Sequence, residues 1–108
     1  MSDTVILLVR FVPKPGMYAK FRESLVNLIE TMRSEQDFVD SILHDDVGHD
    51  GELVLYETWR GTKERWLSEQ PKKPYRQAYE RIVPDLLHRR DVTWLVPIGS
   101  WSRAETAG

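Results

Sequence analysis

Two side chains of this 108-residue chain are candidates for proton transfer, the carboxylate of Glu57 and the imidazole of His44. Glu57 alternates with Leu55 and Trp59, which places an acid on the apolar face of a predicted strand. Burial would raise the pKa of such a carboxylate toward that of a useful general base. His44 ends another strand-like segment, and imidazoles are common acid–base groups near neutral pH. The structural alternatives are an ion pair between Glu57 and Arg10, and a surface or hydrogen-bonded role for His44.

Four aromatic side chains could line a pocket for a flat, polycyclic ligand: Trp59, Trp66, Tyr75 and Tyr79. Tyr75 and Tyr79 lie four residues apart, so a helix would present both rings on one face. Rings at such spacing equally serve as ordinary core. We therefore keep both interpretations open for these four residues.

The segment from His44 to Asp50 contains three aspartates and two histidines, which superficially resembles a metal site. It occupies a predicted hairpin turn that includes the dipeptide Asp50-Gly51, and aspartates favour turns for local backbone reasons. We predict no metal site there. The chain contains no cysteine, which excludes disulfides, thiol catalysis and cysteine-ligated metal centres.

Composition narrows the class of protein and its partners. The net charge is −2, without a sustained basic face, so we expect no nucleic-acid partner. The longest aliphatic run, Val5 to Val9, is too short to cross a bilayer, and no secretory signal is visible. We expect one cytoplasmic domain without membrane contact, spanning residues 1–98, followed by a polar, partly disordered tail at 99–108.

Hydrophobic periodicity places these residues on six main elements. We predict strands at 4–12, 38–44, 53–59 and 92–98, and helices at 16–34 and 75–89, with a short helix at 63–69 between them. Pro15-Gly16 and Gly61-Thr62 are the expected helix starts, and Pro84 should kink the last helix. The order β-α-β-β-α-β is typical of an α+β, ferredoxin-like fold with a four-stranded antiparallel sheet.

Both faces of the predicted sheet are apolar. In the first strand Val5, Leu7 and Val9 alternate with Ile6 and Leu8. Helices can cover only one face, and an exposed apolar patch of several hundred Å² is uncommon on a monomer. A second copy of the sheet is the simplest cover, so we predict a homodimer.

With this organisation, the chain resembles the antibiotic biosynthesis monooxygenase family of the dimeric α/β-barrel superfamily. The resemblance is carried by residues 9–16, by the segment 53–59, which ends in Tyr-Glu-Thr-Trp, and by Lys73-Pro74-Tyr75. It covers roughly residues 4–98. Such a resemblance implies a dimeric α/β barrel with a pocket between helices and sheet in each subunit.

Characterised members of this family oxidise quinol-type aromatics with dioxygen and no cofactor, degrade haem, or act on small carbonyl compounds. The resemblance thus implies a cofactor-independent monooxygenase for a small aromatic molecule, with Glu57 and His44 as catalytic candidates. The expected ligand-binding residues are Trp59, Trp66, Tyr75, Tyr79 and Arg10. A non-catalytic sensor or carrier is the main alternative.

Haem degradation is a further alternative, because Trp66-Leu67 resembles the Trp-Leu of the haem-degrading relatives. Those relatives also carry an Asn on the first strand and a His on the helix that follows. Here Val9 or Arg10 occupies the first region and Tyr79 the second, so the axial ligand is missing.

Overall fold

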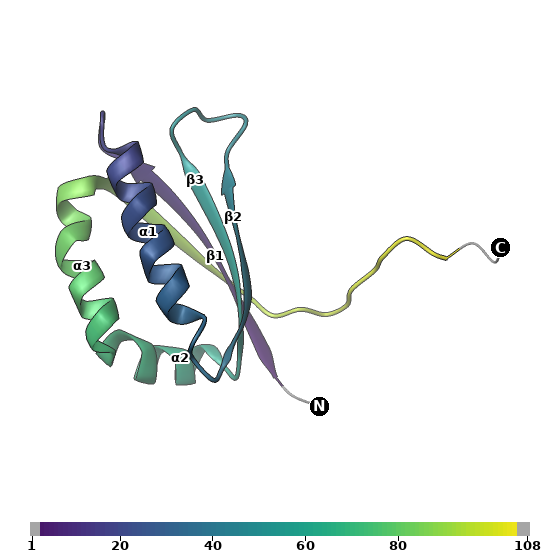
Figure 1. The fold of residues 1–108 in the computed structure, drawn as a ribbon. Helices are drawn as coiled ribbons and strands as arrows, with labels where there is room; N and C mark the ends of the chain where they lie inside the picture. Colours follow the sequence, from purple (N-terminus) through teal and green to yellow (C-terminus); the bar gives the residue numbers. More distant parts are fainter. Residues whose placement is uncertain (1–2, 106–108) are drawn as a thin grey trace.

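The protein forms an α+β fold with one antiparallel sheet and helices on one of its faces (Figure 1). A computed structural model describes residues 3–105. The elements are β1 (Thr4–Pro13), α1 (Tyr18–Met32), β2 (Phe38–Asp45), β3 (Leu53–Arg60), α2 (Lys63–Glu69), the 3-10 helix η1 (Gln70–Lys72), α3 (Pro74–Leu86) and β4 (Leu87–Leu95). The ferredoxin-like fold predicted from the sequence is confirmed.

The sheet has the strand order β2-β3-β1-β4, with every neighbouring pair antiparallel. The hairpin between β2 and β3 turns through Gly51, whose φ of 82° is easily reached only without a side chain. In Figure 1, α1 and α3 lie beside each other over one face of the sheet. No helix within residues 3–105 is long and apolar enough to span a membrane.

The predicted start of α1 at Gly16 is wrong by two residues. Gly16 has a φ of 78°, which a right-handed helix does not allow, so the helix begins at Tyr18. The predicted start of α2 is confirmed, because the side chain of Thr62 accepts a hydrogen bond from the backbone N–H of Arg65.

The boundary between α3 and β4 differs most from the sequence prediction. The expected helix over 75–89 ends at Leu86, and the expected strand over 92–98 runs from Leu87 to Leu95. Pairing with the ten-residue β1 draws residues 87–90 into the sheet. The basic run 88–90, which lies at the end of the helix predicted over 75–89, is therefore part of a strand.

The core lies between the sheet and the helices. From β1 it contains Val5, Leu7, Val9 and Phe11, and from α1 Phe21, Leu25, Leu28 and Met32. On α3, the buried stripe contains Arg76, Tyr79 and Val83, whereas Ile82 is exposed. Residues 96–105 form no helix or strand and extend away from the domain (Figure 1). The last three residues of the expected tail lie outside the described residues.

The opposite face of the sheet carries apolar side chains that no layer within residues 3–105 covers. Ile42 on β2 is 56% exposed and Leu95 on β4 is 40% exposed. Between them, Leu8 on β1 is cross-strand partner of Tyr56 on β3. The alternation of β1 and β3 thus places apolar groups on both faces, as predicted.

Candidate active site

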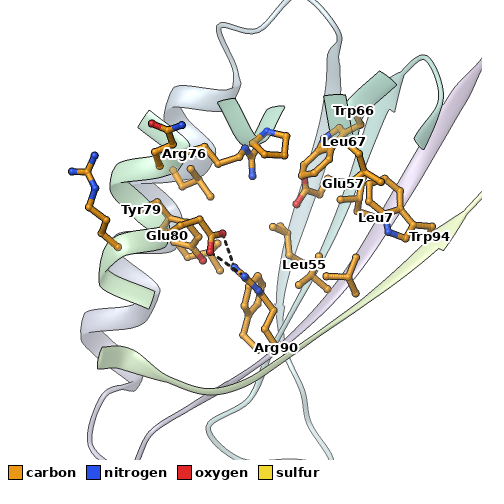
Figure 2. A pocket seen from close by; sticks show the side chains of 18 residues that line it. Leu7, Leu55, Glu57, Trp66, Leu67, Arg76, Tyr79, Glu80, Arg90 and Trp94 are labelled. Atoms are coloured by element: carbon orange, nitrogen blue, oxygen red, sulfur yellow. Dashed lines mark hydrogen bonds and ion pairs between the residues drawn. The ribbon is translucent and has the colours of Figure 1, made fainter. Parts of the chain in front are cut away.

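A cavity of about 640 Å³ lies between the helices and the covered face of the sheet. Its size is typical of sites for small organic molecules. Figure 2 shows side chains of β1, β3, β4, α2 and α3 around it. The lining is mainly apolar, with Leu7, Val9, Phe11, Leu25, Leu28, Leu55, Trp66, Leu67, Pro71, Val92 and Trp94; its polar members are Glu57, Arg76, Gln77, Tyr79, Glu80, Arg81 and Arg90.

Strand register sets the floor of the cavity. Leu7 of β1 lies between its cross-strand partners Glu57 of β3 and Trp94 of β4. Two residues further along β1, Val9 lies between Leu55 and Val92. Because side chains alternate across a strand, these rows share the helix-covered face, and Glu57 is the acidic group within them.

Glu57 is 5% exposed, and its Oε1 accepts a hydrogen bond of 2.7 Å from the indole Nε1 of Trp59. Burial raises the pKa of this carboxyl group, because the charged form loses hydration. The Trp59 hydrogen bond and the positive charge of Arg76 act in the opposite direction. A carboxyl group with a raised pKa beside an apolar cavity is suited to accepting and returning a proton.

Arg76 of α3 brings a buried positive charge to the same cavity. The residue is 8% exposed, and its guanidinium lies 4.9 Å from the centroid of the Trp66 ring, a cation–π distance. Its Nη2 contacts the sulfur of Met32 at 3.2 Å. Within residues 3–105, Arg76 forms no salt bridge, and its Nε has no hydrogen-bond partner. In Figure 2, Arg76 and Glu57 extend from opposite layers toward the same space.

Two further polar atoms at the cavity have no protein partner among the described residues. They are the indole Nε1 of Trp66 and the phenolic oxygen of Tyr79. Burial raises the pKa of Tyr79, so its phenol keeps its proton and can donate. By contrast, Glu80 and Arg90 satisfy each other through two bonds of 2.7 and 3.0 Å (Figure 2).

Of the predicted aromatic residues, Trp66 and Tyr79 line this cavity. Trp59 is 1% exposed and lies behind it, packed edge-on against Trp66 and Phe38. Tyr75 borders a separate hollow of about 240 Å³ between α1 and α3, and Tyr79 borders both.

Arg10 and His44, also predicted from the sequence, do not line either cavity. Arg10 binds Asp46 at 2.6 Å and Glu52 at 3.0 Å, beside the hairpin, and not Glu57. The hydrogen bond from Arg10, with a smaller effect of the backbone N–H of Gly48, lowers the pKa of Asp46 to about 2. His44 is exposed, and its Nδ1 lies 3.0 Å from the backbone oxygen of Val54.

Asp46, His49 and Glu52 bring ligand-type atoms within 4.8 Å of one another. The Arg10 guanidinium binds both of the carboxylates in this group, which accounts for their proximity without a metal ion.

Sequence reasoning missed Arg76, Trp94 and Arg90 as cavity residues. The available signal for Arg76 was its spacing from Tyr79 and Val83, at i, i+3 and i+7 of one helix face. Arg90 was missed because the predicted strand began at residue 92, and the face taken by Trp94 became known only from the register of β4 with β1.

The fold and site define a ferredoxin-like α+β protein with a small-molecule cavity between its helices and its sheet. Family comparison gives the narrower assignment. The model of the antibiotic biosynthesis monooxygenase family matches residues 4–81, and the chain belongs to this family. Comparison with curated proteins finds no significant match.

Solved structures support the same fold over nearly the whole chain. Rv0793 from Mycobacterium tuberculosis is 31% identical, with a TM-score of 0.79, covering 92% of this chain and 99% of that protein. PA3566 from Pseudomonas aeruginosa is 20% identical, with a TM-score of 0.81 and coverages of 92% and 98%. SnoaB, a cofactor-independent oxygenase from Streptomyces nogalater, is 16% identical, with a TM-score of 0.78 and coverages of 94% and 99%.

Proposed function

We propose that this protein is a cofactor-independent monooxygenase that oxidises an aromatic or quinol-like small molecule with dioxygen. The observation that carries the proposal is Glu57, a buried acid with a raised pKa at a largely apolar, partly aromatic cavity. Membership of the monooxygenase family supports it. SnoaB, which shares the fold, is described as a cofactor-independent oxygenase.

In this mechanism Glu57 removes a proton from an acidic C–H or O–H group of the bound substrate. The resulting anion transfers one electron to dioxygen, and the radical pair combines to form a carbon–oxygen bond. The peroxide regains a proton and loses water, so one oxygen atom stays in the product as a carbonyl and the other leaves as water. The apolar lining excludes bulk water, and Arg76 stabilises the anion.

We assign different roles to the aromatic residues. Trp66 and Tyr79 contact the ligand, whereas Trp59 is a positioning residue that holds the carboxylate of Glu57. Tyr75 supports Arg76, whose guanidinium lies 5.9 Å from the Tyr75 ring centroid. Arg10 and His44 receive no role at the cavity, because other contacts hold them elsewhere.

Oxygen uptake with a model hydroxyanthrone tests this function. The wild-type protein should consume oxygen well above the rate in buffer, and Glu57→Gln should lose most of that activity. The matched control is Glu23→Gln, which removes the same charge from an exposed site on α1. Binding of the substrate without oxygen uptake by the wild type would favour the alternative, a sensor or carrier.

The cavity does not fit a haem with an axial protein ligand. No histidine, cysteine or methionine is among the described residues that line it. Haem degradation is therefore not the function we propose.

We also propose that the protein works as a homodimer, with a second copy covering the open face of the sheet. The exposed Ile42 and Leu95 and the neighbouring Leu8 and Tyr56 support this arrangement. Two such faces packed together would complete an α/β barrel and remove their apolar surface from water. The cavity lies on the other side of each sheet.

A further inference from the structure

The polar atoms left without partners share one chemical property. The Nε of Arg76, the Nε1 of Trp66 and the hydroxyl of Tyr79 can all donate a hydrogen bond, and all three are buried. Buried donors are rarely left unsatisfied in proteins, because each has lost its bonds to water. All three groups therefore lack a hydrogen-bond acceptor, and each of the three residues lines the cavity.

The charges around the cavity also favour an acceptor that is negative. Three arginines and two glutamates line it, and Arg90 is neutralised by Glu80. Among the described residues, no carboxylate forms a salt bridge with Arg76, and this includes Glu57. Arg76 faces the rings of Trp66 and Tyr75 and the sulfur of Met32, none of which carries a full charge.

We infer that the natural ligand is an aromatic carboxylate whose anionic group binds at Arg76, beside the donors of Trp66 and Tyr79. The inference rests on the proposed function for its site, a small-molecule cavity, and adds the substrate class. A carboxylate matches the planar fork of one guanidinium, which can donate two parallel hydrogen bonds. A dianionic phosphate would call for a second cation beside Arg76, and Arg90, another arginine of the lining, is already paired with Glu80.

The position of Arg76 strengthens this assignment. It lies in the first turn of α3, where the backbone dipole adds positive potential. Tyr79 follows three residues later on the same helix face. Figure 2 shows Arg76 and Tyr79 on one side of the cavity, with Trp66 and Glu57 together on the other. The acid group of the ligand would thus be held at the helix layer while its ring system reaches the carboxylate of Glu57.

The test compares anthraquinone-2-carboxylate with anthraquinone-2-carboxamide by isothermal titration calorimetry. Both probes are already oxidised, so binding is measured without turnover. The wild-type protein should bind the carboxylate about tenfold more tightly than the amide, the gain expected for one charge-assisted contact. Equal affinity for the two probes, or no binding of either, would overturn the inference.

Variants assign the preference to Arg76. In Arg76→Gln the two probes should bind within about twofold of each other, whereas Arg76→Lys should keep part of the preference. Arg33→Gln is the matched control, because it removes one arginine charge from an exposed site just after the end of α1. An undiminished preference in a folded Arg76→Gln would contradict the assignment. If that variant does not fold, the probe comparison on the wild type still decides the carboxylate preference.

The outcome is independent of the oxidation chemistry. A carboxylate preference together with no oxygen uptake would retain the ligand class and reject the monooxygenase. Oxygen uptake from a hydroxyanthrone without a carboxylate preference would do the reverse.

Discussion

The indole Nε1 of Trp59 donates a 2.7 Å hydrogen bond to the Oε1 of Glu57, two residues earlier on β3. Residues i and i+2 of a strand share a face, so both side chains enter the layer between sheet and helices. Trp59 is 1% exposed and packs between Phe38 and Trp66, which fixes its ring. A rigid donor thereby holds a buried acid in one orientation at the cavity.

Replacing that donor should raise the pKa of Glu57 further. The hydrogen bond from Trp59 favours the charged carboxylate, and Trp59→Phe removes it. Carbon-13 NMR of labelled glutamate across a pH titration should show the Glu57 carboxyl titrating at higher pH than in the wild type. Trp101→Phe, at an 85% exposed position, is the control and should leave this titration unchanged. An unaltered Glu57 titration in Trp59→Phe would show that the hydrogen bond does not govern the acid.

The raised pKa of Glu57 has a defined effect on stability. A group whose folded pKa exceeds its unfolded value contributes stability that is fully present below the unfolded pKa, about 4.3 for glutamate, and that is lost as pH rises through the folded pKa. Glu57→Gln cannot ionise and its amide oxygen can still accept from Trp59. Relative to the wild type, its free energy of unfolding should therefore increase between pH 4 and pH 8.

Urea denaturation of both proteins at several pH values measures this difference. Glu23→Gln should show a difference from the wild type that changes little over the same range, since Glu23 is exposed. A stability difference for Glu57→Gln that does not change with pH would mean that burial does not destabilise the charged form of Glu57.

Asp46 should show the opposite pH dependence. Arg10 holds the pKa of Asp46 at about 2, below its unfolded value, so the contact stabilises the fold above the unfolded pKa of about 3.9. That contribution is lost as pH falls through about 2. Asp46→Asn should be less stable than the wild type at pH 7, and the deficit should shrink in acid.

Thermal unfolding by circular dichroism between pH 2 and pH 7 follows this change. Asp85→Asn, an exposed change on α3, provides a comparison without such a partner within the described residues. If the Asp46→Asn deficit persists at pH 2, the ion pair with Arg10 is not its source.

A charge on the open face of the sheet should dissociate the proposed dimer. Ile42 is 56% exposed there, and Ile42→Glu would bury an unpaired carboxylate between two sheets. Sedimentation equilibrium should show a dimer for the wild type and a monomer for Ile42→Glu at micromolar concentration. Val47→Glu makes the same change at a fully exposed hairpin position and should remain dimeric. A monomeric wild type would remove the basis for the barrel.

Local sequence patterns were sufficient for the type and order of the elements. Alternation in β1 and β3, the three- and four-residue spacing in α1 and the turn at Gly51 depend on contacts close in the chain. The same alternation placed Glu57 on a buried face. It also indicated that the second face of the sheet is apolar, because successive residues of a strand point to opposite faces.

Pairing between distant strands determined the rest. The register of β4 with β1 ended α3 at Leu86, turned a predicted helix end into a strand and brought Arg90 and Trp94 to the cavity. Arg10 forms ion pairs with Asp46 and Glu52 beside the hairpin, whereas the sequence had suggested Glu57 as its partner.

By itself, the sequence determined a ferredoxin-like fold with an acid on its covered face, since periodicity encodes which face each residue takes. It could not show that Arg76 would be buried without an ionic partner among the described residues. Whether a charge is neutralised depends on which side chains reach it from other elements, and only the tertiary structure decides that.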